Sequence, residues 1–278
     1  MVGDGRTGSG RVGSAADGST RVRRVVWELR RQGSKAPDRG WTELARQTLL
    51  VACAVALYFQ VRGLTEGATS TAIANGHDIL DFEQAIGIAI ERSLQARVLE
   101  SLLLTTLANW IYIWLHWPVI IATLVWLHER HRPRYLVIRN AMFVSGAVGL
   151  AIFVLYPVAP PRLLNAGFVD TVTDLSTSYR VLQPPSLVNK YAAMPSLHVG
   201  WNLLVGITLW RASRRWSIRA VAIAGPTLMS VSVVATANHY LVDGIVGSFV
   251  ALFGLLVAER ITQASPIDEV GPEKGRRG

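Results

Sequence analysis

The sequence predicts an all-α fold: an integral membrane bundle of six transmembrane helices with an extracytoplasmic amphipathic helical segment. Of the 278 residues, 50% are hydrophobic and 17% are charged, whereas a soluble domain has about 25% charged residues. Six apolar runs follow one another along the chain, and a membrane-spanning helix needs roughly 20 apolar residues. The basic residues are concentrated in the segments between alternate runs. Together these observations argue against a protein surrounded by water.

The apolar runs give the positions of the expected spans. They are residues 47–61, 101–127, 140–161, 191–210, 220–238 and 240–258, of which the first is the shortest. Residues 63–100 are too polar for a span, but six apolar residues recur there at helical spacing: Ile79, Phe82, Ile86, Ile90, Leu94 and Val98. We expect one or two amphipathic helices, with the charged Glu83, Glu91 and Arg92 between the apolar positions, on the outer membrane surface or capping the bundle.

The distribution of basic residues predicts the orientation in the membrane. Six spans with a cytoplasmic N-terminus place 22 of the 28 Lys and Arg residues inside, in residues 1–46, 128–139, 211–219 and 259–278. Cytoplasmic loops of membrane proteins have such an excess. We therefore expect a multi-pass protein of the cell membrane with both termini in the cytoplasm. The net charge of +9 is then a topology signal, and we expect no nucleic-acid partner.

Composition also divides the chain. Residues 1–40 are rich in Gly, Ser, Arg and Asp with almost no apolar periodicity, which predicts a disordered basic cytoplasmic tail. Residues 41–260 would form the membrane domain, and 261–278 a second disordered cytoplasmic tail. The single cysteine, Cys53, excludes a disulfide framework and a metal site built from cysteines.

Ionisable residues at the outer ends of the spans suggest chemistry, because such groups are costly at membrane depth. His198 opens the fourth span, and His239 stands at the start of the sixth. Asp243 follows His239 by four residues, so one helical face presents both, and the carboxylate can hold the imidazole in one tautomer. The alternative is a capping histidine and an aspartate paired with an arginine. His116, by contrast, lies within an apolar run and suggests a structural histidine.

A proline-rich segment ends the third span and leads to Arg162. The topology places Arg162 on the same side as His198, His239 and Asp243, and arginine is suited to binding phosphate in a bidentate manner. One Arg, two His and one Asp, with no cysteine set or carboxylate cluster, indicate phosphoryl transfer through histidine. We expect the reaction to need no metal ion and no cofactor.

Two short motifs support this interpretation. Pro195-Ser196-Leu197-His198 and His239-x-x-x-Asp243 resemble the second and third signature blocks of the type 2 phosphatidate phosphatase superfamily, in its membrane branch. Leu197 stands where that family usually has Gly, and Val233 where it has Arg. The first block, Lys followed after six residues by Arg-Pro, is absent in that form. Ala159-Pro160-Pro161-Arg162 and His239-Tyr240-x-x-Asp243 look closer to the inositol phosphorylceramide synthase/sphingomyelin synthase-like group.

The resemblance implies a role for each residue. His239 would be the nucleophile that becomes phosphohistidine, Asp243 would orient it, and His198 would be the general acid and then the general base. The implied phosphate-binding residues are Arg162 and Ser196, with Lys190 and Arg180 as candidates to replace the missing Lys and Arg.

The resemblance thus implies a phosphoric ester hydrolase or phosphotransferase with its site at the extracytoplasmic face. Its substrate would be a lipid phosphate of the polyisoprenyl, glycerolipid or inositol lipid type. Two alternatives stay open: an inositol-type phospho-headgroup transferase, and a non-catalytic lipid transporter or scaffold that keeps the fold.

The orientation can be tested by cysteine labelling of intact cells in a Cys53→Ser background. A cysteine introduced between residues 165 and 185 should react with a membrane-impermeant maleimide, because this segment is expected outside. Ser213→Cys, in an expected inner loop, should react only after permeabilisation. The reverse pattern would invert the topology.

Overall fold

The computed structural model describes residues 45–54, 56, 60, 68–175 and 190–264. The chain divides into two units, Met1–Cys53 and Ala54–Gly278. In the first unit, residues 45–53 are helical. The expected tail 1–40, part of the first expected span and residues 265–278 of the second expected tail lie outside the described residues.

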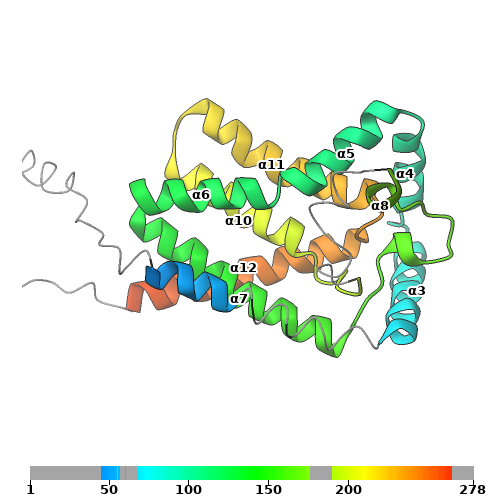
Figure 1. Ribbon diagram of the computed structural model, residues 1–278, viewed down its shortest axis with the longest axis horizontal. Helices are drawn as coiled ribbons and strands as arrows, with labels where there is room; N and C mark the ends of the chain where they lie inside the picture. Colours follow the sequence, from blue (N-terminus) through cyan, green and yellow to red (C-terminus); the bar gives the residue numbers. More distant parts are fainter. Residues whose placement is uncertain (1–44, 55, 57–59, 61–67, 176–189, 265–278) are drawn as a thin grey trace, which may run out of the picture. The chain divides into compact units, whose positions relative to one another are not determined.

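The described part of the second unit consists of helices (Figure 1). In chain order they are α3 (Thr69–Ala85), α4 (Glu91–Leu99), α5 (Leu102–Trp114), α6 (Trp117–Arg130), α7 (Arg132–Leu155), the 3-10 turn η1 (Pro161–Leu163), α8 (Thr171–Leu175), α10 (Leu197–Ala212), α11 (Trp216–Ala235) and α12 (Leu241–Ala264). Within the described ranges, β-pairing is limited to one parallel bridge between Val158 and Ala192. The prediction of an all-α fold is confirmed for these residues.

Several helices are suited to a membrane. Arg132–Leu155, Trp216–Ala235 and Leu241–Thr262 are each long and apolar enough to cross it, and α5 with α6 could form a fourth span that is bent by 42°. Large apolar side chains are exposed on these helices, among them Leu103 and Phe249, as expected where lipid replaces water. The helices fit a multi-pass membrane protein, and the number of six spans stays a prediction.

Helix α10 is shorter than the span expected at 191–210. Its 16 residues extend for about 24 Å, less than the roughly 30 Å of a bilayer core. The helix starts late because Pro195 precedes it and the Ser196 side chain caps it by accepting from the Val199 N–H. Helices α6, α7, α11 and α12 all pack against α10, which places it at the centre of the bundle.

Two glycines bring the first turn of α10 and the first two turns of α12 together. A Cβ atom at Gly247 would collide with the backbone of Ser196, and one at Gly200 would collide with the carbonyl of Gly247. At this approach the Ser196 N–H donates to the Asp243 carbonyl at 2.9 Å. The glycines therefore fix the distance between the residues that begin the two helices.

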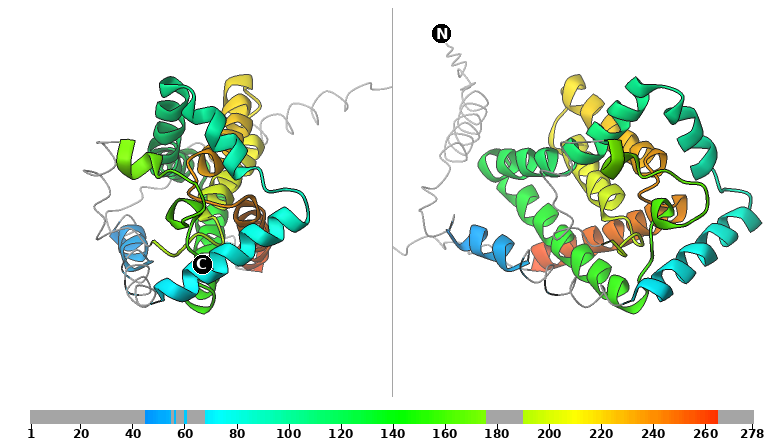
Figure 2. Two further views of the ribbon diagram at one scale, coloured as in Figure 1. Left: turned by 90° about the vertical axis from the view of Figure 1, so that its right-hand side faces the viewer. Right: turned by 45° about the vertical axis from the view of Figure 1, so that its right-hand side comes forward.

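Helices α3 and α4 lie at the end of the bundle where α10 and α12 begin (Figures 1 and 2). Two helices agree with the expectation for residues 63–100, and the structure adds which of their side chains are buried. Glu83 and Glu91 are fully buried, whereas Phe82, Ile86 and Ile90 are about half exposed. The reason is that both carboxyl groups bind the backbone of α12.

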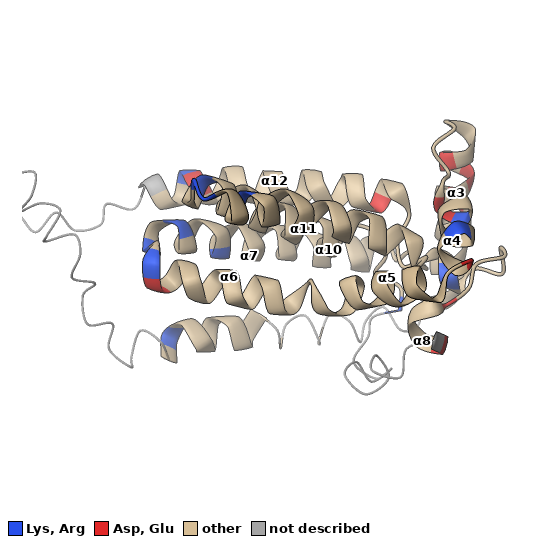
Figure 3. Cartoon of the chain, turned by 90° about the horizontal axis from the view of Figure 1, so that it is seen from above, with Lys and Arg blue, Asp and Glu red and all other residues tan. Residues whose placement is uncertain are grey.

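Charge is segregated between the two ends of this unit (Figure 3). Basic residues gather where α7 begins and where α10 and α12 end, including Arg132, Arg134 and Arg211. Acidic residues gather on α3, on α8 and at the first turn of α12, whereas α4 between them has Glu91 together with Arg92 and Arg97. This is the polarity that the positive-inside rule relates to orientation.

The close approach of α10 and α12 predicts unequal effects of two Gly→Ala substitutions. An alanine in a helix gains up to about 1 kcal/mol in propensity, but overpacking costs about 1–3 kcal/mol. Gly247→Ala should therefore lower the midpoint of thermal unfolding in detergent. Gly225→Ala, whose Cβ would meet open space, should leave it unchanged or raise it. Equal midpoints would show that the contact does not constrain the bundle.

Candidate active site

The candidate site lies where three chain segments meet: the one after α7, the one before α10 and the one before α12. The Val158 N–H donates to the Tyr191 carbonyl at 2.9 Å, and the Ala193 N–H donates to the Val158 carbonyl at 3.2 Å. The Arg162 N–H donates to the Ala237 carbonyl at 3.0 Å. Backbone hydrogen bonds thus hold the three segments side by side.

His239 is buried, and its ring has a defined tautomer. Nδ1 lies 2.8 Å from the Ala193 carbonyl oxygen and 3.3 Å from Oδ2 of Asp243. A carbonyl oxygen can only accept, so Nδ1 bears the hydrogen and Nε2 keeps its lone pair. Burial, opposed by the hydrogen bond to Ala193 and aided by the charge of Arg162, lowers the pKa of His239 to about 4. The ring is therefore neutral at physiological pH.

Asp243 lies beside His239, as the four-residue spacing predicts, although His239 precedes α12. Its Oδ2 accepts the Tyr240 N–H at 2.9 Å, a shorter contact than the one with His239. Asp243 is fully buried. The carboxylate therefore caps the first turn of α12 and faces Nδ1 of the histidine. The nearer partner of that nitrogen, the Ala193 carbonyl, has no signature in the sequence.

His198 stands in the first turn of α10 with its ring centroid 5.6 Å from that of His239. The ring of Tyr112 stacks on it at 4.8 Å, and the ring of His116 lies 4.3 Å away. Asn202 Nδ2 donates to the His198 carbonyl at 2.8 Å and lies 3.1 Å from Nδ1 of His116. Three histidines thus lie in a row across the site.

The sequence predicts a structural His116, and the structure places this ring between Asn202 and the ring of His198. It lies in the bend between α5 and α6 and is 4% exposed. The signal available in the sequence was a histidine within a long apolar run. That signal does not reveal its neighbours, because His198 is 82 residues further along the chain.

Arg162 is held from two sides. Its Nε donates to Oδ1 of Asn238 at 2.8 Å, and its Nη1 donates to Oδ2 of Asp170 at 2.7 Å. A guanidinium has five N–H donors in a planar fork, and these bonds use two of them. Arg162 is thus oriented and can still bind an anion near His239. Neither Asp170 nor Asn238 was recognised from the sequence.

The remaining expected phosphate-binding residues differ in their positions. Ser196 is fully buried, and its side chain caps α10 while its backbone N–H binds Asp243. Lys190 is exposed at the start of the segment that leads to α10. Arg180 lies outside the described residues. The structure therefore brings together Arg162, His198, His239 and Asp243. Ser196 is buried next to Asp243, to which its backbone N–H donates.

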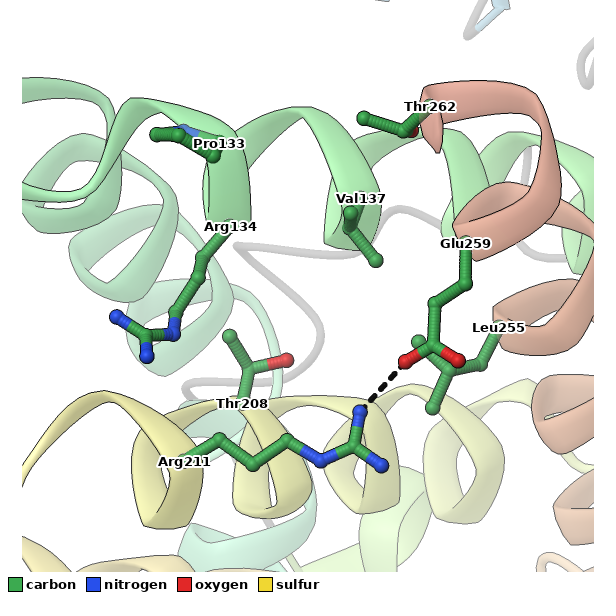
Figure 4. Close-up of a pocket in the computed structure, with 8 residues that line it drawn as sticks. All are labelled: Pro133, Arg134, Val137, Thr208, Arg211, Leu255, Glu259 and Thr262. Atoms are coloured by element: carbon green, nitrogen blue, oxygen red, sulfur yellow. Dashed lines mark hydrogen bonds and ion pairs between the residues drawn. The ribbon is translucent and has the colours of Figure 1, made fainter. Parts of the chain in front are cut away.

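A separate pocket lies at the other ends of α7, α10 and α12 (Figure 4). It has a volume of about 260 Å³, and its lining includes Arg134, Thr208, Arg211 and Glu259. Arg211 and Glu259 form an ion pair of 2.6 Å. No candidate site residue lines it. In the part of the chain that the structure describes, no group of three or more His, Cys, Asp or Glu has a geometry that could hold a metal ion.

Comparison with known proteins gives one match. A family model described as the PAP2 superfamily matches residues 77–257, which is more than half of the chain and includes every candidate site residue. No curated protein matches, and no solved structure matches. The family match agrees with the resemblance of the sequence motifs at the level of the superfamily. The narrower likeness to the inositol phosphorylceramide synthase/sphingomyelin synthase-like group stays a prediction.

The position of Arg162 predicts that the site binds vanadate, an anionic analogue of phosphate. Vanadate should raise the midpoint of thermal unfolding of the purified protein. Arg162→Lys should weaken this binding about 10- to 100-fold, since a lysine loses the fork and the bond to Asn238, and hydrogen bonds to charged groups contribute about 1.5–3 kcal/mol. Arg219→Lys, on α11 near its start, is the control. Equal affinity in both variants would remove Arg162 from the anion site.

Proposed function

The chain belongs to the PAP2 superfamily, and on that premise we propose that it transfers the phosphoryl group of a membrane lipid phosphate through a phosphohistidine at His239. This superfamily in general comprises phosphoesterases and phosphotransferases, and it implies membrane association and phosphorylated substrates of the lipid type. The phosphohistidine, the residue roles and the side of the membrane are our inference from the site.

The tautomer of His239 is the observation on which the proposal depends. A histidine attacks phosphorus only with an unprotonated nitrogen. The Ala193 carbonyl holds the hydrogen on Nδ1, and the lowered pKa keeps Nε2 unprotonated at neutral pH. The site therefore presents a neutral nucleophile before any substrate arrives.

The first step is attack on the bound phosphate. Nε2 of His239 forms a bond to phosphorus, and the bond between phosphorus and the lipid oxygen breaks. Arg162 stabilises the negative charge on the phosphoryl oxygens, since phosphoryl transfer depends mainly on positioning and electrostatics. His198, whose ring lies next to that of His239, acts as an imidazolium that the negative charge of the bound phosphate favours, and it gives its extra proton to the leaving lipid oxygen. The ring of His239 becomes cationic, and the Ala193 carbonyl with Asp243 stabilises that charge.

The second step returns the enzyme to its first state. A hydroxyl group attacks the phosphohistidine, and His198 takes the proton of that hydroxyl. The bond between phosphorus and nitrogen breaks, and the neutral ring is restored. Water as acceptor gives a phosphatase, whereas a polyol or lipid hydroxyl gives a transferase, including one of the inositol type. Lys190 and Arg180 are proposed to add positive charge near the phosphate.

The site is proposed to open to the extracytoplasmic face, with both termini in the cytoplasm of a cell-membrane protein. The charge distribution supports this orientation, because the histidines lie at the acidic end of the described unit and the basic residues gather at the other end (Figure 3). A site at the membrane surface allows a lipid phosphate to reach the histidines from the bilayer.

An assay of substrates and acceptors tests the proposed function. Purified protein should release phosphate from at least one polyisoprenyl, glycerolipid or inositol lipid phosphate. With inositol present, a transferase should form a phosphoinositol product in place of free phosphate. Neither product and no phosphoenzyme, from a folded protein, would favour the non-catalytic transporter or scaffold.

The two catalytic histidines should behave differently when each is replaced. His239→Ala should abolish both turnover and the acid-labile, base-stable phosphate on the protein. His198→Ala should still form phosphoenzyme from a nitrophenyl phosphate, because that leaving group needs little protonation. With a lipid substrate it should lose about 10²–10⁴-fold in rate, the usual contribution of a positioned acid.

Asp243→Asn should fall between these variants, since it keeps the shape and loses the charge that stabilises the imidazolium. Phosphoenzyme retained in His239→Ala and absent in His198→Ala would exchange the two roles. Label retained in both single variants would remove histidine from the chemistry.

A further inference from the structure

Three carboxyl groups surround the first turn of α12. Asp243 Oδ2 accepts the Tyr240 N–H at 2.9 Å, Glu91 Oε1 accepts the Leu241 N–H at 2.9 Å, and Glu83 Oε1 accepts the Val242 N–H at 2.7 Å. Three consecutive N–H groups of a helix start, which have no partner within the helix, are thereby satisfied. Two of the three acceptors come from α3 and α4, which are about 150 residues away in the sequence.

These carboxyl groups are close together and fully buried. The positive end of the helix dipole favours negative charge there, but three carboxylates would repel one another with little screening. The second oxygens of Glu83 and Glu91 have no protein donor among the described residues. The two glutamates bind consecutive N–H groups of one helix turn, so a proton on Glu83 that is donated to Glu91 would satisfy both second oxygens.

The same contacts reach both halves of the candidate site. Leu241 and Val242 follow directly after His239 and Tyr240, so fixing their N–H groups fixes the segment that holds the nucleophile. The hydroxyl of Tyr240 donates to the Ala159 carbonyl at 2.9 Å, and the Ala159 N–H donates to the Ala72 carbonyl of α3 at 2.9 Å. Helix α3 therefore contacts the segments that contain His239 and Arg162.

We propose that Glu83 and Glu91 are positioning residues for His239, acting as a carboxyl–carboxylate pair that shares one proton and holds the start of α12. The inference rests on the proposed function, since positioning has meaning only if His239 reacts. On this proposal α3 and α4 do more than cover the end of the bundle: they position His239 through Glu83 and Glu91.

The shared proton makes the arrangement sensitive to alkaline pH. Burial, the hydrogen bond that protonated Glu83 can donate to Glu91, and the charges of Glu91 and Asp243 raise the pKa of Glu83 from 4.5 to about 8, although the Val242 N–H opposes them. The stabilisation from the protonated form is full below about pH 4.5 and is lost as the pH rises through about 8. The other titratable groups that face this cluster do not change charge near pH 8. Burial lowers the pKa of His239, and burial with the three carboxyl groups raises the pKa of Tyr240.

The test is the pH profile of kcat in two variants at position 83. Glu83→Ala removes the acceptor for the Val242 N–H and should lower kcat about 10- to 100-fold with little change in KM, as small misplacements of a reacting group do. Glu83→Gln keeps the acceptor and supplies an N–H to Glu91 without a proton that can be lost. It should recover most of the kcat lost in Glu83→Ala. Its alkaline limb, expected near pH 8 in the wild type, should move up by about one unit or more.

Asp81→Asn is the matched control, because Asp81 is exposed on the same helix; it should keep the wild-type profile. An unchanged alkaline limb in Glu83→Gln, or an unchanged kcat in Glu83→Ala, would overturn the positioning role. Thermal unfolding of the wild type and Glu83→Gln between pH 6 and 9 tests the shared proton without catalysis: only the wild type should lose stability. Equal losses would overturn the pair even in an active enzyme, whereas an inactive wild type would overturn the proposed function.

Discussion

The hydrogen bond between Nδ1 of His239 and the Ala193 carbonyl is the interaction on which the rest of the site depends. It determines which nitrogen has the lone pair, and so which nitrogen can attack phosphorus. Asp243 lies farther from the ring and mainly accepts a backbone N–H. In this chain a main-chain carbonyl therefore lies nearer to the histidine than the carboxylate does, and in the proposed mechanism it provides much of the orientation that a carboxylate provides in a catalytic triad.

The bundle provides this bond through contacts between distant segments. The carbonyl belongs to the segment before α10, and the histidine belongs to the segment before α12. Gly200 and Gly247 allow the two helices to approach, and the bridge between Val158 and Ala192 holds the segment of Arg162 beside them. The late start of α10 has the same cause. Residues 191–196 make backbone contacts with the segments beside them and are not part of the helix.

Part of this could be predicted from the sequence. Apolar runs and segregated charge indicated a helical membrane bundle, and short motifs singled out His198, His239, Asp243 and Arg162, which the structure brings together. The Ala193 carbonyl could not be predicted, because a backbone atom has no signature in the residue types. The neighbours of His116 and of the two glutamates could not be predicted either, because these partners are about 80 to 160 residues away in the sequence. Local periodicity placed Glu83 and Glu91 on a polar face, whereas hydrogen bonding to α12 buries them.

The most direct test of the account is the position of the phosphoryl group on the trapped phosphoenzyme. Phosphorus NMR distinguishes phosphohistidine modified at Nε2 from that modified at Nδ1, and peptide mapping identifies the residue. The account predicts modification of His239 at Nε2, because the Ala193 carbonyl occupies the other nitrogen. Phosphate on Nδ1 of His239, or on another residue, would contradict it.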